Sequence, residues 1–493
     1  MRNENTRSAD LSGVIADLPE AASSPSLDSC AVPAPAPAPA VETIFALSSA
    51  PGRAGVAVVR VSGPAAGRAL AALIGYRPPP RQARLATLRG SGGEAIDRAL
   101  VLWFPAPRSF TGEDVAEFHI HGGRAVVAAV TAALAAVPGL RPAEAGEFAR
   151  RAFDNGKLDL AEIEGLADLI AAETEAQRRQ ALRQMDGALS RQIAAWRARL
   201  VASLGRLEAA IDFVDEDLPA DLVIGVAGDI AALRDDIAAG LEDGRCAERL
   251  RGGLWVAIVG APNVGKSSLI NALAQRDVAI VSDVPGTTRD AIEVHLDLGG
   301  YPVTVVDTAG LRALLGADES SAHGALEREG MRRARARAAA ADLILALFDL
   351  RDAPTFDPAT LALVDGRTLV VLNKADLTTR PGPATVAGRP AVAISARTGA
   401  GLDELIARIQ QTAAAALDSG APAPITRARH RRALEECLDA LTRAERICLA
   451  TGSELELAAE DLRLAGRALG RIAGRVDVED VLDSIFREFC IGK

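Results

Sequence analysis

The pattern of apolar and polar positions changes its period several times along the chain. Residues 44–47, 55–61 and 98–104 are short runs rich in branched apolar residues, with glycine and proline between them, which predicts strands. Residues 126–135 have the spacing of a helix. We therefore expect an α+β module that ends near Asn155.

From Leu158 the pattern becomes strongly helical. Apolar residues recur there at spacings of three and four, which predicts one face of a single long helix and favours the core of a bundle. These residues are Leu182, Met185, Leu189, Ile193, Trp196, Leu200, Leu204, Leu207 and Ile211. A second helical block, residues 425–469, suggests one discontinuous helical-bundle domain with another module inserted into it.

Residues 251–415 alternate strand and helix signals between the two helical blocks. Continuous apolar strands of this kind are typical of a parallel sheet that is covered on both faces. The predicted strands are 255–259, 302–306, 343–348, 368–372 and 391–394. The predicted fold class is therefore multidomain, α/β and α.

A glycine-rich loop follows the first of these strands and precedes a helix. Its sequence is Gly260-Ala261-Pro262-Asn263-Val264-Gly265-Lys266-Ser267-Ser268. Glycines in this position allow backbone N–H groups to converge on phosphate oxygens at a helix N-terminus. Lys266 is suited to the β- and γ-phosphates and Ser267 to Mg²⁺, so the loop predicts a nucleoside triphosphate site.

Four further segments indicate that the nucleotide is GTP. The Asp of Asn373-Lys374-Ala375-Asp376 is suited to the paired N–H donors of guanine, which adenine lacks. Ser395-Ala396-Arg397, Asp307-Thr308-Ala309-Gly310 and the loop at Gly286-Thr287-Thr288 supply groups for guanine O6, the γ-phosphate and Mg²⁺. The predicted GTP-binding residues are Asn263, Val264, Gly265, Lys266, Ser267, Ser268, Ser282, Asp283, Val284, Pro285, Gly286, Thr287, Thr288, Asp307, Thr308, Ala309, Gly310, Asn373, Lys374, Ala375, Asp376, Ser395, Ala396 and Arg397.

The residue that positions water for hydrolysis is not evident from these motifs. Leu311 follows Asp-Thr-Ala-Gly and cannot orient water as a glutamine would. Asn263 is a candidate ligand for a monovalent cation beside the phosphates, where an arginine finger otherwise lies. Arg289 and Arg312 are competing sources of positive charge, and the sequence leaves this choice open.

Composition limits the remaining possibilities. The net charge of −10 makes the chain as a whole a poor nucleic-acid binder, and Arg332–Arg337 has the spacing of a solvated helix face. Five scattered cysteines, no secretory signal and no apolar run of bilayer length favour the cytoplasm. His119 and His121 have His-x-His spacing, but no third metal ligand is evident, and we expect strand alternation to put one on each face.

Motifs outside the nucleotide module resemble one family. They are Pro51-Gly52-Arg53, Ser109-Phe110-Thr111-Gly112-Glu113-Asp114, His119-Ile120-His121-Gly122-Gly123, Ala145-Gly146-Glu147-Phe148, the segment from Arg151 to Leu160, and Cys490-Ile491-Gly492-Lys493. With the nucleotide motifs, they resemble the bacterial tRNA-modification GTPases of the MnmE (TrmE) family, whose G domain is of the TrmE-Era-EngA type.

The resemblance implies a potassium-stimulated GTPase. It implies a potassium site at Asn263, Ser282, Val284 and Thr287, and Mg²⁺ ligands at Ser267 and Thr288. Glu327 matches the glutamate that positions water and is expected to be catalytic together with Lys266. Extra residues around Gly316–Gly324 leave Glu329 as an alternative to Glu327. Cys490 is a second catalytic candidate, with burial as a small apolar side chain the competing interpretation.

The resemblance also implies a folate site, a partner and a domain order. Arg60, Glu117, Lys157 and Lys493 match positions that hold a 5,10-methylene- or 5-formyl-tetrahydrofolate. A homodimer would work with the flavoprotein MnmG (GidA), which carries FAD, in a heterotetramer or larger complex that modifies C5 of the tRNA wobble uridine. The expected parts are a disordered Ala/Pro-rich tail (1–40), a folate-binding and dimerisation domain (41–157), helical parts (158–250 and 416–493) and a G domain (251–415). The alternative is a ribosome- or RNA-associated GTPase switch without modification chemistry.

Overall fold

The structure is a computed structural model that describes most of the chain. It describes residues 42–212, 222–276, 278–280, 293–307, 338–417, 425–450 and 454–474, and positions 482, 485, 486, 489, 491 and 492. The predicted tail, residues 1–40, lies outside the described residues. No described helix is both long and apolar enough to cross a bilayer.

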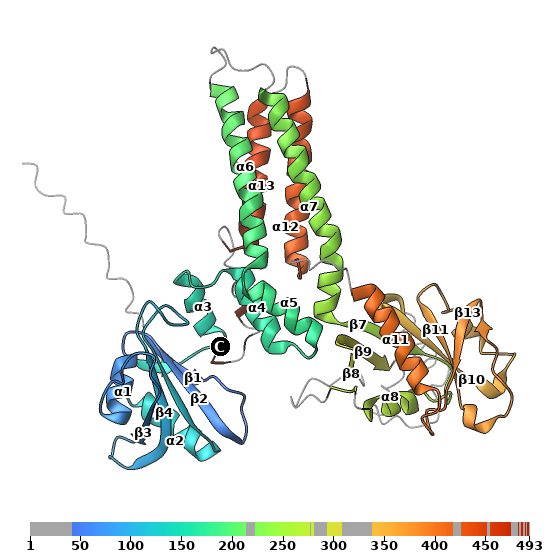
Figure 1. Cartoon of the computed structure of the whole chain (residues 1–493), viewed down its shortest axis with the longest axis horizontal. Coiled ribbons are helices and arrows are strands. Elements are labelled where there is room, and N and C mark those ends of the chain that lie inside the picture. The colour runs from blue at the N-terminus through green and yellow to red at the C-terminus, as the bar shows by residue number, and fades with distance from the viewer. Residues whose placement is uncertain are drawn as a thin grey trace, which may run out of the picture. The chain divides into compact units, whose positions relative to one another are not determined.

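The first part is the predicted α+β module (Figure 1). Its sheet has the strand order β3-β4-β5-β2-β1-β6. The strands are β1 (Thr43–Leu47), β2 (Ala54–Ser62), β3 (Arg84–Arg89), β4 (Ala95–Phe104), β5 (Val115–Gly122) and β6 (Leu140–Pro142). Helices α1 (Ala66–Ile74) and α2 (Arg124–Ala135) share one apolar core with the sheet.

Strand β5 shows why one expectation about this module was wrong. Ala116, Phe118 and Ile120 are buried in the core, whereas Glu117, His119 and His121 alternate with them. Because side chains on a strand repeat every second residue, His119 and His121 lie on the same face and not on opposite faces. No group of three or more metal-ligating side chains occurs among the described residues.

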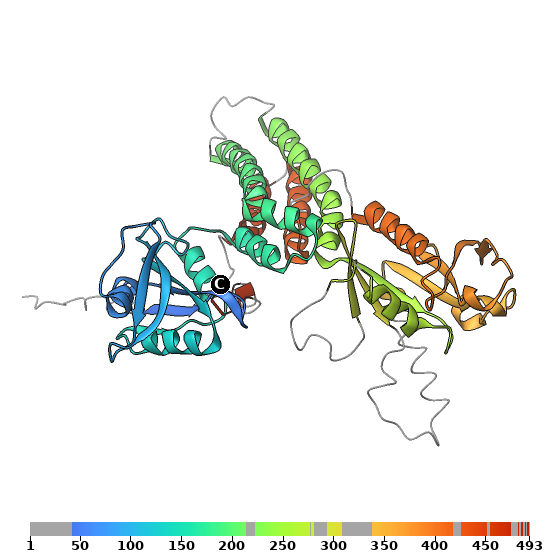
Figure 2. The same cartoon turned by 60° about the horizontal axis from the view of Figure 1, so that its bottom comes forward.

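The second part is an all-helical domain. Its helices are α4 (Leu160–Ala171), α5 (Glu175–Met185), α6 (Ala188–Asp212), α7 (Leu222–Gly252), α12 (Ala428–Leu449) and α13 (Leu455–Ile472). Helix α3 (Glu147–Asp154) precedes them and packs through Phe148 against β1 of the α+β module. Helices α6, α7, α12 and α13 run beside one another in both views (Figures 1 and 2) and share one core. The prediction of a single long helix was wrong, because the left-handed Gly187 (φ 78°) separates α5 from α6.

The third part is the predicted α/β module. Its sheet has the order β12-β13-β11-β10-β7-β9-β8, and the edge strands β8 and β12 are antiparallel to their neighbours, unlike the parallel centre. The strands are β7 (Leu254–Val259), β8 (Glu293–Leu298), β9 (Tyr301–Asp307), β10 (Leu343–Asp349), β11 (Thr368–Asn373), β12 (Thr385–Val386) and β13 (Arg389–Ala393). Helices α8 (Lys266–Ala274) and α11 (Leu402–Leu417) pack on it.

A buried charged cluster joins the two halves of the helical domain. Glu164 of α4 is fully buried and accepts two hydrogen bonds from the Arg429 guanidinium, both at 2.6 Å. His430, also fully buried, lies 2.9 Å from Glu164 through its Nε2. Burial alone would raise the pKa of Glu164, but His430 and Arg429 outweigh it and lower that pKa to about 2. Burial lowers the pKa of His430.

Replacing Glu164 with Gln should destabilise the helical domain strongly. The substitution removes a fully buried carboxylate and leaves the partly buried Arg429 guanidinium without its counter-charge, which costs up to about 3–5 kcal/mol. Urea unfolding followed by circular dichroism measures the loss. Glu436→Gln is the control, because Glu436 forms an exposed pair with Arg471 and should change little. Equal midpoints for the two variants would contradict this role of the cluster.

Candidate functional site

The glycine-rich loop forms a tight turn between β7 and α8. Gly265, the residue before Lys266 at the start of α8, has φ 100°. A Cβ at Gly260 would lie 2.5 Å from the Leu347 carbonyl oxygen, and a Cβ at Gly265 would lie 2.3 Å from Asn373 Nδ2. Both positions therefore require glycine. The predicted strand, loop and helix are confirmed, and they point the N-terminus of α8 into the loop.

Lys266 is held inside this loop. Its Nζ donates to the carbonyl oxygens of Gly260 and Ala261, both at 2.9 Å, and the residue is 9% exposed. A lysine in this position provides a point charge for phosphate oxygens.

Asn373 ties the loop to the predicted guanine pocket. Its Nδ2 donates to the Val264 carbonyl at 2.8 Å, and its Oδ1 accepts from the Ala396 N–H at 3.0 Å. Ser395 Oγ donates to Asp376 Oδ1 at 2.7 Å, which orients that carboxylate. The structure thus brings together three segments that the sequence predicted to bind one nucleotide.

Asp349 belongs to this site, although sequence analysis missed it. The Lys374 Nζ donates to the Asn263 carbonyl at 2.7 Å and to Asp349 Oδ2 at 2.8 Å. Hydrogen bonds from Arg351 and Lys374 hold the pKa of Asp349 well below its usual value, despite burial. In the sequence, Asp349 is recognisable only as an acidic residue at the end of the apolar strand β10. This feature is too common to indicate a site by itself.

Several predicted site residues cannot be placed. Ser282, Asp283, Val284, Pro285, Gly286, Thr287, Thr288, Thr308, Ala309, Gly310, Glu327, Cys490 and Lys493 lie outside the described residues, as do Arg289, Leu311, Arg312, Glu329 and the segment 332–337. Asp307 ends β9, and its side chain is not described. Their assignments remain predictions.

A second polar site lies in the α+β module. Arg60 on β2 donates from Nε to Glu117 Oε1 at 3.0 Å, and its Nη2 lies 3.0 Å from the same oxygen. The Arg60 guanidinium carbon is 5.1 Å from the Phe110 ring centroid and 5.8 Å from that of Phe148. Two aromatic faces therefore flank this cation, which favours a fixed orientation.

The loop that carries Phe110 is fixed by buried polar groups. Ser62 Oγ donates to Glu113 Oε2 at 2.7 Å, and Arg151 donates to both oxygens of Glu113 at 3.1–3.2 Å. Asn155 donates to the Thr111 carbonyl at 2.8 Å. Ser62 lies on β2, whereas Arg151 lies on α3 and Asn155 caps the end of that helix, so these contacts join segments that are far apart in the sequence.

Two of the four predicted folate residues, Arg60 and Glu117, form a direct pair, and Lys157 has a different partner. Arg60 and Glu117 are bonded to each other, whereas Lys157 is exposed and donates to the Pro107 carbonyl at 3.2 Å. Lys493 is not described, but Ile491 forms an antiparallel bridge with Ala145. The C-terminal segment thus reaches the α+β module.

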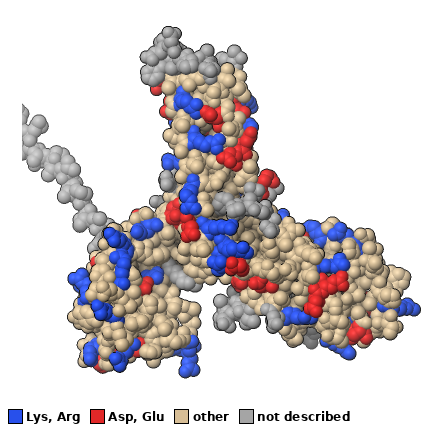
Figure 3. All heavy atoms as spheres, viewed as in Figure 1, with Lys and Arg blue, Asp and Glu red and all other residues tan. Residues whose placement is uncertain are grey.

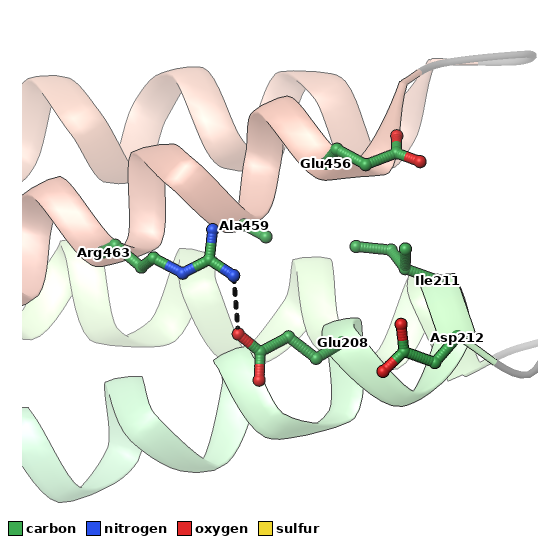
Figure 4. A pocket seen from close by; sticks show the side chains of 6 residues that line it. All are labelled: Glu208, Ile211, Asp212, Glu456, Ala459 and Arg463. Atoms are coloured by element: carbon green, nitrogen blue, oxygen red, sulfur yellow. Dashed lines mark hydrogen bonds and ion pairs between the residues drawn. The ribbon is translucent and has the colours of Figure 1, made fainter. Parts of the chain in front are cut away.

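A hollow between α6 and α13 is a weaker candidate (Figure 4). Its lining includes the carboxylates of Glu208, Asp212 and Glu456, and Arg463 donates to Glu208 at 2.8 Å. The excess of carboxylates disfavours phosphate or a folate tail.

Comparison with known proteins agrees with this geometry. A family model described as the MnmE helical domain matches residues 160–490, and one described as the GTP-binding protein TrmE N-terminus matches residues 43–157. A "tRNA modification GTPase MnmE" from Paramagnetospirillum magneticum is 55% identical and covers 92% of this chain and 100% of its own length. One of the same name from Parvibaculum lavamentivorans is 56% identical with the same coverage. A solved structure of Era with MgGDPNP and ribosomal RNA is 29% identical, with a TM-score of 0.24, and covers 32% of this chain and 56% of that chain.

The fold and the nucleotide site define a P-loop GTPase whose G domain is inserted into a helical domain. The chain belongs to the MnmE family of tRNA-modification GTPases.

Replacing Asp349 with Asn should weaken GDP binding by roughly 5- to 30-fold, which corresponds to about 1–2 kcal/mol. The reason is that Lys374 loses the charge that holds it against the Asn263 carbonyl. Fluorescent GDP titration measures the dissociation constant. Arg408→Gln is the control, because this exposed arginine on α11 pairs with Glu404, one helical turn away, and not with Asp349. Wild-type affinity in Asp349→Asn would contradict this role.

Proposed function

We propose that this chain is a potassium-stimulated GTPase that modifies C5 of the wobble uridine in certain tRNAs, with a reduced folate as one-carbon donor and a flavoprotein partner. The observation that carries the proposal is the presence of two organised polar sites in one chain. One is the loop bonded to Asn373, and the other is the Arg60–Glu117 pair flanked by Phe110 and Phe148.

The proposed chemistry at the nucleotide follows from the donors available. Asn263 has a left-handed backbone (φ 64°) that is held by Lys374, and its side-chain amide oxygen is a suitable ligand for K⁺. Ser282, Val284 and Thr287 would complete the potassium site, with Ser267 and Thr288 on Mg²⁺. A bound potassium ion would supply positive charge for the transition state, and Glu327 would position the attacking water.

The proposed folate site uses charge complementarity. Glu117 suits the amidine-like edge of a pterin, while Arg60, Lys157 and Lys493 suit carboxylates of the folate tail. The bridge between Ile491 and Ala145 supports the contribution of Lys493. The folate would supply the carbon unit, FAD would be carried by the partner MnmG, and Cys490 is a candidate acid or nucleophile.

A cytoplasmic homodimer in complex with MnmG is part of the same proposal. The sheet face away from α1 and α2 exposes Val56, Leu85 and Leu100, each more than 45% exposed, which supports association through this face. Figure 3 shows acidic and basic side chains interspersed on the visible face, so tRNA contacts are not assigned to particular residues.

The second candidate is a GTPase switch that binds RNA or the ribosome without modifying it. The nucleotide site alone fits both functions. The fixed polar site around Arg60 and Glu117 favours modification, because a GTPase switch without modification chemistry does not require a second ligand site.

GTP turnover should be at least about tenfold faster in KCl than in NaCl, because K⁺ stabilises developing charge in the transition state. Asn263→Ala should remove this difference. Phosphate release in the two salts is the measurement, and Asn271→Ala, an exposed asparagine on α8, is the control. Equal wild-type rates in both salts would remove potassium from the mechanism.

The full chain should bind 5-formyltetrahydrofolate, and Arg60→Ala should weaken that binding roughly 30-fold, because a charged hydrogen bond is lost. Calorimetry gives the dissociation constant. Arg124→Ala, at the exposed start of α2, is the control. Absence of folate binding by the wild-type chain would favour the switch.

A further inference from the structure

The second oxygen of the Glu117 carboxylate has its own partner. His119 follows two residues later on the same face of β5, and its Nε2 lies 3.2 Å from Glu117 Oε2. The His119 and Glu117 side chains are 31% and 17% exposed, so water screens this contact only in part.

The hydrogen bonds to Glu117 divide between its two oxygens. Oε1 lies within 3.0 Å of two nitrogens of Arg60, which fills its two acceptor positions. Oε2 has His119 as its partner and keeps one acceptor position. A ligand N–H that bonds to this carboxylate would therefore meet the oxygen that His119 orients.

The residues around His119 offer its ring few other hydrogen-bond partners. Val58 on β2 and Leu100 on β4 lie directly across from it in the sheet. Glu117 is the one hydrogen-bond partner of the ring among the described residues. His121, two residues further on, has Asp97 instead, with Nδ1 2.8 Å from Asp97 Oδ1.

We propose that His119 is a positioning residue for the folate site: its Nε2–H donates to Glu117 Oε2 and sets the direction of the remaining acceptor position toward the pterin edge. This inference rests on the proposed folate function. Arg60 alone fixes one oxygen and leaves the carboxylate free to rotate about it. His119 removes that rotation, so the ligand does not have to order the carboxylate when it binds.

The test measures 5-formyltetrahydrofolate binding to full-length variants by calorimetry. His119→Leu removes the donor at similar volume and should weaken binding roughly tenfold. His119→Gln keeps an N–H donor and should stay within about threefold of wild type. His121→Leu is the matched control on the same strand and face and should bind as wild type. Unchanged melting temperatures exclude misfolding.

A double-mutant cycle separates positioning from a general structural effect. In a Glu117→Gln background, His119→Leu should cause no further loss, because its effect passes through the carboxylate. Wild-type affinity in His119→Leu, or equal loss in His119→Leu and His119→Gln, would overturn this inference alone. A wild-type chain that binds no folate would overturn the proposed function as well.

Discussion

The buried contact between Glu164 and the Arg429–His430 pair is the interaction on which the rest of the architecture depends. It joins residues 265 positions apart, on either side of the inserted G domain. A fully buried carboxylate such as Glu164 is stable as a charge only when its partners are held in place, and here α12 holds Arg429 and His430 against α4. Arg429 also donates to the carbonyl oxygens of Arg471 and Ile472, so the same guanidinium caps the end of α13. This cluster thus holds together α4, α12 and α13, which belong to the helical domain that contains the inserted G domain.

Within the G domain, the nucleotide loop is organised by groups that do not belong to it. Asn373 bonds to Val264, and Lys374 joins the Asn263 carbonyl to Asp349. The loop conformation is therefore set by the ends of β10 and β11 before a nucleotide arrives, which lowers the cost of ordering it on binding. The α+β module uses the same principle, since Glu113 and Arg151 fix the loop that brings Phe110 against Arg60.

Sequence patterns predicted the features that are determined by neighbouring residues in the chain. The strand, the Gly260–Lys266 loop and the helix were predicted because phosphate binding requires that order, and the structure confirms them. Asn373 and Asp376 were selected because their side chains suit guanine, and that assignment stays a prediction. Residues that act through tertiary contacts were missed. In the sequence, Glu164 is one polar position on an amphipathic helix, and Asp349 is the last residue of a strand. The break at Gly187 was missed because apolar spacing continues across it. His119 and His121 were misplaced although strand periodicity alone puts them on one face.

The proposed function joins both sites in one reaction, and its product is the most direct readout. Mass analysis of the wobble uridine should be made after incubating unmodified tRNA with this chain, the flavoprotein partner, GTP, KCl and a reduced folate. An aminomethyl-type mass increase that requires this chain and GTP is the predicted result. An unmodified uridine, while GTP is hydrolysed at the full rate, would contradict the modification function and favour a switch.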